Sequence, residues 1–162
     1  MQFKKFTAGT ESYGLDILPD YKQESNVCFY DPKLQQHLDD TGSHNNEALI
    51  RCIVFLACCH TIVIDQKKGT YNASSPDELA LVNAAKEFGY EFTAKDENDN
   101  IVIYDKIKKQ TLKYQLLNVC EFTSTRKRMS CIFRDPQGKL LLMCKGADSV
   151  IEELLSPQSR SS

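Results

Sequence analysis

Three short stretches of this 162-residue chain carry side chains suited to a charged, aromatic ligand. Phe122 stands just before the basic run Arg126–Arg128, and Lys145 is followed by Gly146. An aromatic face can stack on a nucleobase, a lysine ammonium can pair with a phosphate, and a glycine lets a ligand approach the backbone. The residue types indicate a nucleotide site, provided that the fold brings these stretches together.

The elements between these stretches indicate that the fold brings the three stretches together. Strands are expected over Leu112–Phe122, Arg128–Arg134 and Lys139–Lys145. The last two are joined by Asp135-Pro-Gln-Gly138, which is a typical turn sequence. In an antiparallel meander of this order, Phe122, the basic run and Lys145 all lie at one end of the sheet. The continuous apolar run Leu140–Cys144 also predicts that the last strand is covered on both faces.

A helix start precedes these strands. Ser75 fits an N-cap, Pro76 the first helical position, and Glu78 the third position of a capping box. Gly89 provides a left-handed stop after the apolar residues of the helix. Glu78 can serve this cap or a ligand, and the pattern alone leaves both roles open.

The remaining segments complete an α+β fold, in which helices flank an antiparallel β-sheet. One hairpin is expected, in which the strands Tyr90–Ala94 and Ile101–Tyr104 flank the turn-rich segment Lys95–Asn100. The other expected elements are a short helix over Asp31–Asp40, a buried helix over Asn46–Cys59, a final helix over Asp148–Leu155, at most one strand within Met1–Phe29, and a loose tail over Ser156–Ser162.

Composition narrows the function. With 20 Lys and Arg against 22 Asp and Glu, the net charge of −2 disfavours a general nucleic-acid binder. Seven cysteines without paired spacing favour free thiols in a reducing compartment. The longest apolar stretch, Cys52–Ile64, is shorter than the roughly 20 residues that a membrane span needs. Cys58-Cys59-His60 lacks a second pair at zinc-like spacing, so no metal site is predicted.

Structural explanations compete with the nucleotide site. An aromatic residue at a strand end is usually part of the core, and a short basic run is usually a solvated loop. Lys145 can simply mark the edge of the sheet. The chain also contains neither a G-x-x-x-x-G-K-[ST] loop nor a G-x-G-x-x-G turn.

Three strings in the chain resemble the nucleotide-binding (N) domain of P-type ATPases, and most of all its type IV branch, the phospholipid flippases. They are YNASSPDELALVNAAKEFGYEF, YQLLNVCEFTSTRKRMSCIFR and LLLMCKGADSVIEEL. The lead-in MQFKKFTAGTESYG and the string CCHTIVI also match the family, so the resemblance covers nearly the whole chain.

The resemblance implies an ATP-binding domain, spanning residues 1–155, on the cytosolic face of a membrane. Phe122 would stack on adenine, and Lys127 would approach the phosphates or line the adenine pocket. Lys145 would form the floor of the pocket, while Glu78, with Asp77 sharing one of its roles, would face the adenine edge. Gly146 and Ala147 would let the nucleotide lie close to the backbone.

The resemblance also implies partners. In this family the domain presents the γ-phosphate of ATP to an aspartate in a phosphorylation domain, alongside an actuator domain, Mg²⁺ and an accessory membrane subunit. The family motif DKTGT is absent from the 162 residues, so these residues alone are not expected to be catalytic. The family's GLRTL-like segment after KGAD is absent too, and we expect an exposed sheet edge where its last strands would pair.

A different class of function remains open. The fold could serve as a protein-interaction or regulatory module without productive nucleotide binding, with Glu24–Asn46 and Lys95–Asn100 as contact surfaces. RNA binding through Arg126–Arg128 is disfavoured by the net charge. Replacing Phe122 with alanine distinguishes the nucleotide site from the interaction module, because it should abolish ATP binding in the first case and leave partner binding intact in the second.

Overall fold

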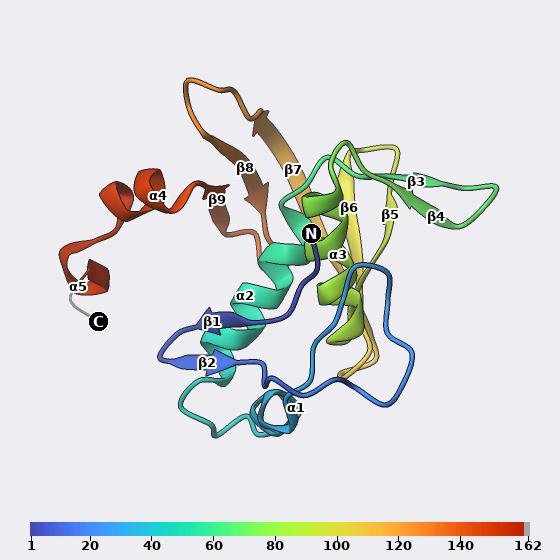
Figure 1. Ribbon diagram of the computed structural model, residues 1–162. Helices are drawn as coiled ribbons and strands as arrows, with labels where there is room; N and C mark the ends of the chain where they lie inside the picture. The colour runs from blue at the N-terminus through green and yellow to red at the C-terminus, as the bar shows by residue number, and fades with distance from the viewer. Residues whose placement is uncertain (161–162) are drawn as a thin grey trace.

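A five-stranded antiparallel sheet forms the centre of the structure, a computed structural model that describes residues 1–160 (Figure 1). Neighbouring strands follow one another in chain order, which makes the sheet a meander. The strands are β5 (Tyr90–Lys95), β6 (Asn100–Asp105), β7 (Gln110–Cys120), β8 (Arg128–Arg134) and β9 (Leu140–Gly146). The predicted α+β class and the meander are both confirmed.

Local sequence explains the turns of this meander. At the β8–β9 turn, the Asp135 carboxylate accepts hydrogen bonds from the backbone N–H groups of Gln137 and Lys139, and Gly138 adopts a φ of +85°. Such side-chain-to-backbone bonds close tight turns locally. Alternation in β6 buries Ile101 and Ile103 on the inner face of the sheet.

Two helices cover that inner face, α2 (Asn46–Cys58) and α3 (Pro76–Glu87), and α1 (Pro32–Asp39) packs against α2. Helix α2 contacts β5, β6 and α3, and α3 contacts β5 (Figure 1). As predicted, Ser75 caps α3, because its hydroxyl accepts the Glu78 N–H at 3.1 Å. Gly89, at a φ of +99°, follows the end of α3 and leads directly into β5.

The N-terminal segment is more regular than the sequence predicts. It forms a hairpin of two strands, β1 (Phe6–Ala8) and β2 (Glu11–Tyr13), where one strand at most was expected. Each strand has three residues, which is too few for an alternation pattern to emerge from the sequence. A second short hairpin, β3 (Val63–Asp65) with β4 (Thr70–Asn72), links α2 to α3.

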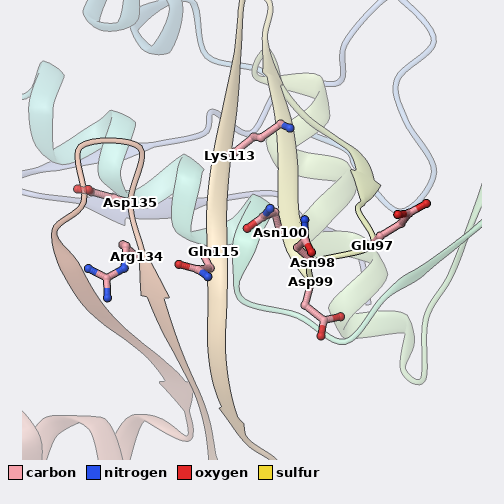
Figure 2. A pocket seen from close by; sticks show the side chains of 8 residues that line it. All are labelled: Glu97, Asn98, Asp99, Asn100, Lys113, Gln115, Arg134 and Asp135. Atoms are coloured by element: carbon pink, nitrogen blue, oxygen red, sulfur yellow. The ribbon is translucent and has the colours of Figure 1, made fainter.

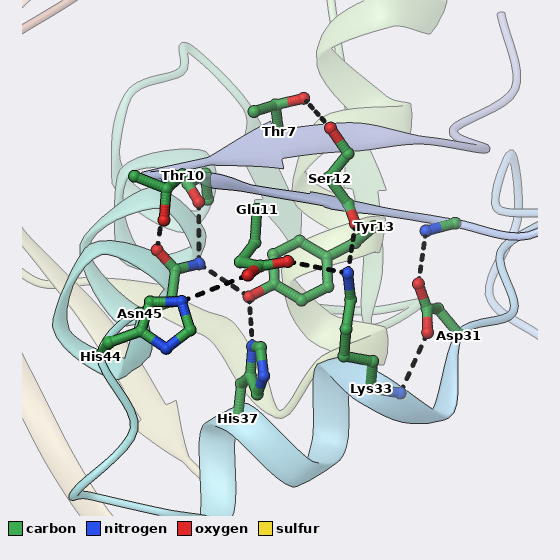
Figure 3. Close-up of polar contacts among 12 residues, drawn as sticks. Thr7, Thr10, Glu11, Ser12, Tyr13, Asp31, Lys33, His37, His44 and Asn45 are labelled. Carbon is green, nitrogen blue, oxygen red and sulfur yellow. Dashed lines mark hydrogen bonds and ion pairs between the residues drawn. The ribbon is translucent and has the colours of Figure 1, made fainter. Parts of the chain in front are cut away.

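A polar cluster, which we call the N-terminal hub, joins the first hairpin to α1 and α2 (Figure 3). Its side chains are those of Glu11, Tyr13, Lys33, His37 and Asn45. The Asn45 amide donates to the Ala8 carbonyl at 2.8 Å and to the Tyr13 hydroxyl at 2.7 Å. The same hydroxyl lies 2.8 Å from His37 Nδ1. The Lys33 ammonium binds the Glu11 carboxylate at 3.0 Å. The hub therefore joins segments more than twenty residues apart.

The prediction that β9 is covered on both faces is wrong. Strand β9 lies at the edge of the sheet, paired only with β8, and Leu142 on it is 71% exposed. A continuous apolar run reports the character of a strand but not its position in the sheet. Open β-strand edges can pair with another chain.

The chain leaves β9 through α4 (Asp148–Leu154) and one further helical turn, α5 (Pro157–Arg160), which extend away from the sheet (Figure 1). The tail predicted from Ser156 onward therefore contains a helical turn, and its last two residues, 161 and 162, lie outside the described residues. No helix within residues 1–160 combines the length and apolarity of a membrane span.

Candidate functional site

A cavity of about 740 Å³ opens where α3 begins, where the β7–β8 loop turns and where β9 ends. We call it the cleft. Five of the seven residues predicted for the site line it: Asp77, Glu78, Phe122, Lys145 and Gly146. Thr61, Ser74, Ser75, Leu81, Glu121 and Met129 complete the lining. The convergence of the sheet end with the start of α3 was only half visible in the sequence, since the meander alone does not place Glu78.

Phe122 is an exposed ring rather than a core residue. Strand β7 ends at Cys120, two residues earlier than predicted, so Phe122 stands on the loop with 63% of its surface exposed. A large exposed aromatic side chain loses much of the free energy that burial would provide. Its position in a cavity wall favours a ligand-facing role over the core explanation.

Glu78 lines the same cavity from the first turn of α3 and is only 8% exposed. Its carboxylate accepts hydrogen bonds from the Thr61 backbone N–H and the Thr61 hydroxyl, both at 3.0 Å, and from Ser74 at 3.4 Å. It does not close the predicted capping box, because both oxygens face these donors. Only the Ser75 half of that box forms.

The charge of Glu78 is balanced by Lys145. The Lys145 ammonium lies 3.4 Å from Glu78 Oε1, and the lysine side chain is 22% exposed. Burial raises the pKa of Glu78, but the Lys145 ammonium and the two bonds from Thr61 outweigh it, so the pKa lies below its ordinary value. Glu78 is therefore ionised at neutral pH.

Lys145 reaches the cleft because it lies at the end of β9, opposite Met129 of β8. Met129 is buried and lines the same cavity. The lysine thus points toward the covered side of the sheet. The alternative that it merely marks an exposed strand edge does not hold.

Gly146 is required by the neighbouring strand. A Cβ at this position would lie 2.6 Å from the Lys127 carbonyl oxygen and 2.6 Å from the Arg128 Cβ. The sequence predicted that a ligand would come close to Gly146, but the atoms that lie closest to it belong to Lys127 and Arg128, at the start of β8. Any approach by a ligand would share that space.

Lys127 and Ala147 meet at the rim but do not line the cleft. The Ala147 N–H donates to the Lys127 carbonyl at 3.1 Å, and Lys127 has a φ of +52°. A left-handed conformation is uncommon for residues other than glycine. The backbone thus fixes Lys127 next to the end of β9, outside the cavity wall.

Thr61 is the main residue of the site that sequence reasoning missed. It lies just after α2 and donates two hydrogen bonds to Glu78. Its only signal in the sequence was a hydroxyl within the apolar stretch that ends at Ile64. Its contact with Glu78 spans seventeen residues, which local patterns do not reveal.

The residue before Thr61 in the chain, His60, is buried and neutral. Its Nε2–H donates to the Ala57 carbonyl at 2.8 Å, and its Nδ1 accepts the Ile62 N–H at 3.1 Å. Burial lowers the pKa of His60 to about 4. Both ring nitrogens thus hydrogen-bond to backbone groups around the end of α2.

A second hollow, of about 630 Å³, extends across β7 from the β5–β6 turn to the β8–β9 turn (Figure 2). Its eight lining residues are Glu97, Asn98, Asp99, Asn100, Lys113, Gln115, Arg134 and Asp135. None of them is aromatic, and Asp135 and Arg134 bind the backbone of their own turn. The cleft, by contrast, combines the exposed Phe122 ring with an ion pair whose carboxylate is buried.

Comparison with known proteins connects this geometry to a family. The family model described as P-type ATPase, cytoplasmic domain N matches residues 47–158. The chain is 42% identical over 129 residues to phospholipid-transporting ATPase DRS2 of Saccharomyces cerevisiae. The matched region covers 78% of this chain and 9% of that protein. It is 44% identical over 123 residues to probable phospholipid-transporting ATPase 7 of Arabidopsis thaliana, covering 72% of this chain and 10% of that protein.

A human relative gives the same result. The chain is 42% identical over 135 residues to phospholipid-transporting ATPase IC of Homo sapiens, covering 82% of this chain and 10% of that protein. The chain thus spans about a tenth of the length of these relatives.

Proposed function

Since this chain belongs to the P-type ATPase family as its cytoplasmic N domain, we propose that the cleft binds ATP. The observation that carries the proposal is the exposed Phe122 ring standing in one cavity with the Lys145–Glu78 ion pair. An aromatic face and a cation are what a base and a phosphate chain require. The binding domain is residues 1–155.

Each wall of the cleft has a role in this proposal. Phe122 stacks on adenine, and Lys145 on the floor attracts the base and the phosphate chain. Glu78 faces the adenine edge, where its carboxylate can accept from the exocyclic amine, with Asp77 beside it. Lys127 at the rim reaches toward the phosphates, while Gly146 and Ala147 let the nucleotide pass close to the backbone.

For the larger protein we propose ATP-driven phospholipid transport, supported by the names of the relatives. In that scheme the domain delivers the γ-phosphate to an aspartate of a phosphorylation domain, with an actuator domain completing the cytosolic part. In the same proposal Mg²⁺ accompanies ATP in the larger protein, with its carboxylate ligands in the other domains. An accessory membrane subunit belongs to the same proposal.

An NMR titration of the chain with ATP, with and without Mg²⁺, tests the binding step. Saturable shifts at Glu78, Phe122 and Lys145 are expected at about millimolar ATP, which corresponds to a free energy near −4 kcal/mol. Phe122→Ala should weaken binding roughly 5- to 150-fold, the range for loss of one base stack. Lys145→Ala should weaken it as well.

Leu18→Ala is the matched control, because Leu18 is 80% exposed and is more than forty residues away in the sequence from every residue that lines the cleft. It should bind ATP as the parent does. A well-dispersed spectrum that does not respond to millimolar ATP would overturn the proposal and favour the interaction module.

A further inference from the structure

Arg126 has the most extensively bonded side chain of its basic run: its guanidinium makes four hydrogen bonds, whereas that of Arg128 makes one, to the Arg126 carbonyl at 3.1 Å. Arg126 Nη1 donates to the carbonyl oxygens of Cys120 at 3.0 Å, Glu121 at 2.9 Å and Arg128 at 3.3 Å. Its Nη2 donates to the buried Ser130 hydroxyl at 3.3 Å. Few donors on this group are left for a ligand.

These bonds lie where β7 and β8 separate. The last pair in register between the two strands is Cys120 with Ser130, and beyond it the chain forms the loop that carries Phe122. Arg126 contacts oxygens on both strands at this point. Its planar fork thus replaces the ladder hydrogen bonds that end there.

The loop itself is folded around the same residue. The Arg126 N–H donates to Thr123 Oγ1 at 3.1 Å, and the Lys127 N–H donates to the Thr123 carbonyl at 2.8 Å. Phe122, by contrast, has 63% of its surface exposed and so gains little support from packing. The placement of its ring depends on the backbone of the loop.

We infer that Arg126 is a positioning residue that holds the Phe122 ring in place for base stacking by tying Glu121 to β8. This inference rests on the proposed function, because it assumes that Phe122 meets the base. It assigns Arg126 a role that does not involve the phosphates. A guanidinium acting on phosphate by charge alone would be replaceable by lysine, whereas a fork bridging two strands is not.

The test compares Arg126→Lys with the parent chain, using ATP and adenosine as separate probes in NMR titrations. Arg126→Lys keeps the positive charge but loses the fork. We expect it to weaken both ligands by the same factor, at least about threefold and below the roughly 150-fold of a complete stack. Arg134→Gln, which removes a charge at the opposite end of β8, where Arg134 bonds only to the Gly138 carbonyl of its own turn, should leave adenosine binding unchanged.

A double-mutant cycle sharpens the result. In the Phe122→Ala background, Arg126→Lys should cause no further loss, because the ring that it positions is gone. An additive loss, a loss confined to ATP, or parent-like binding of both ligands would each overturn the inference.

One measurement needs no ligand. Amide hydrogen exchange at Arg126 and Lys127, whose N–H groups bond to Thr123 within the loop, should accelerate in Arg126→Lys and not in Arg134→Gln, while the rest of the sheet keeps its protection. Unchanged exchange in Arg126→Lys contradicts the inference even if the chain binds no ATP. Failure of the proposed function is recognised separately, by a parent chain that does not bind ATP or by a Phe122→Ala variant that binds as the parent does.

Discussion

The N-terminal hub and the cleft are both polar clusters, but they use their polar groups in opposite ways. In the hub, the Asn45 amide, the Tyr13 hydroxyl and His37 satisfy one another within the chain (Figure 3). In the cleft, Glu78 is held by Thr61 and Lys145, yet the Phe122 ring in the same cavity faces solvent. The comparison separates a cluster that stabilises the fold from one that leaves a surface for a ligand.

Removing the centre of the hub should have the largest effect on stability. Asn45→Ala deletes the bonds to Ala8 and Tyr13 and the bond that its Oδ1 accepts from the Thr10 N–H. Buried groups left without partners cost about 1–3 kcal/mol each, so we expect the free energy of unfolding to fall by about 3 kcal/mol. Urea unfolding measures this loss, and Asn118→Ala on the exposed face of β7 is the matched control.

The ATP affinity of the folded Asn45→Ala fraction should equal that of the parent. A variant that keeps its stability but loses ATP binding would remove the distinction between the two clusters.

Acid should destabilise the chain through His60, which lies between the core and the cleft. The pKa of His60 is about 4 in the folded chain and near 6.5 when unfolded. Between these values the unfolded state binds a proton that the native state does not, so the free energy of unfolding falls as pH drops from 6.5 to 4. The loss approaches about 3 kcal/mol.

Urea unfolding at several pH values within this window measures the slope. His60→Gln keeps an amide donor and acceptor but does not titrate, so its slope should be much smaller. An equal slope in both proteins would show that protonation of another group controls the acid response.

Thr61→Val probes how the cleft keeps Glu78 ionised. Valine retains the shape and the backbone N–H bond but removes the hydroxyl bond to Oε2. We expect a loss of about 1.5–3 kcal/mol in the free energy of unfolding, the range for a hydrogen bond to a charged group. The pKa of Glu78 should rise toward its ordinary value, because one of the contacts that lower it is gone.

The carboxyl carbon shift of Glu78, followed by NMR against pH, reports this pKa. Thr61→Ser restores the hydroxyl and should restore both quantities. If Thr61→Val leaves the pKa unchanged, the Lys145 ammonium and the Thr61 backbone bond alone hold the carboxylate.

Local signals predicted the helices and the meander because their causes lie within a few residues. Ser75 and Pro76 begin α3, and the Asp135–Gly138 turn joins β8 to β9. The same meander brought Phe122 and Lys145 into one cavity, as expected. Sequence patterns thus found the part of the site that one supersecondary unit builds.

Long-range contacts account for what was missed. Asn45 reaches partners more than thirty residues away, and Leu140 and Leu142 of β9 are exposed although their apolar run predicts a strand covered on both faces. Lys127 was predicted for the site, yet its left-handed backbone and its bond to Ala147 place it at the rim. These features arise only when separate elements pack together.

Phe122→Ala should change the free energy of unfolding least, by less than about 0.5 kcal/mol, since substitutions of exposed side chains away from special features are usually nearly neutral. The ring is 63% exposed and its loop is tied by Arg126 rather than by packing of the ring. Urea unfolding of the variant that has lost ATP affinity tests this directly. A loss as large as that of Asn45→Ala would mean that Phe122 is a structural residue, and the contrast between hub and cleft would collapse. A neutral change beside lost binding would show that the chain keeps this aromatic surface for a ligand at little cost to its stability.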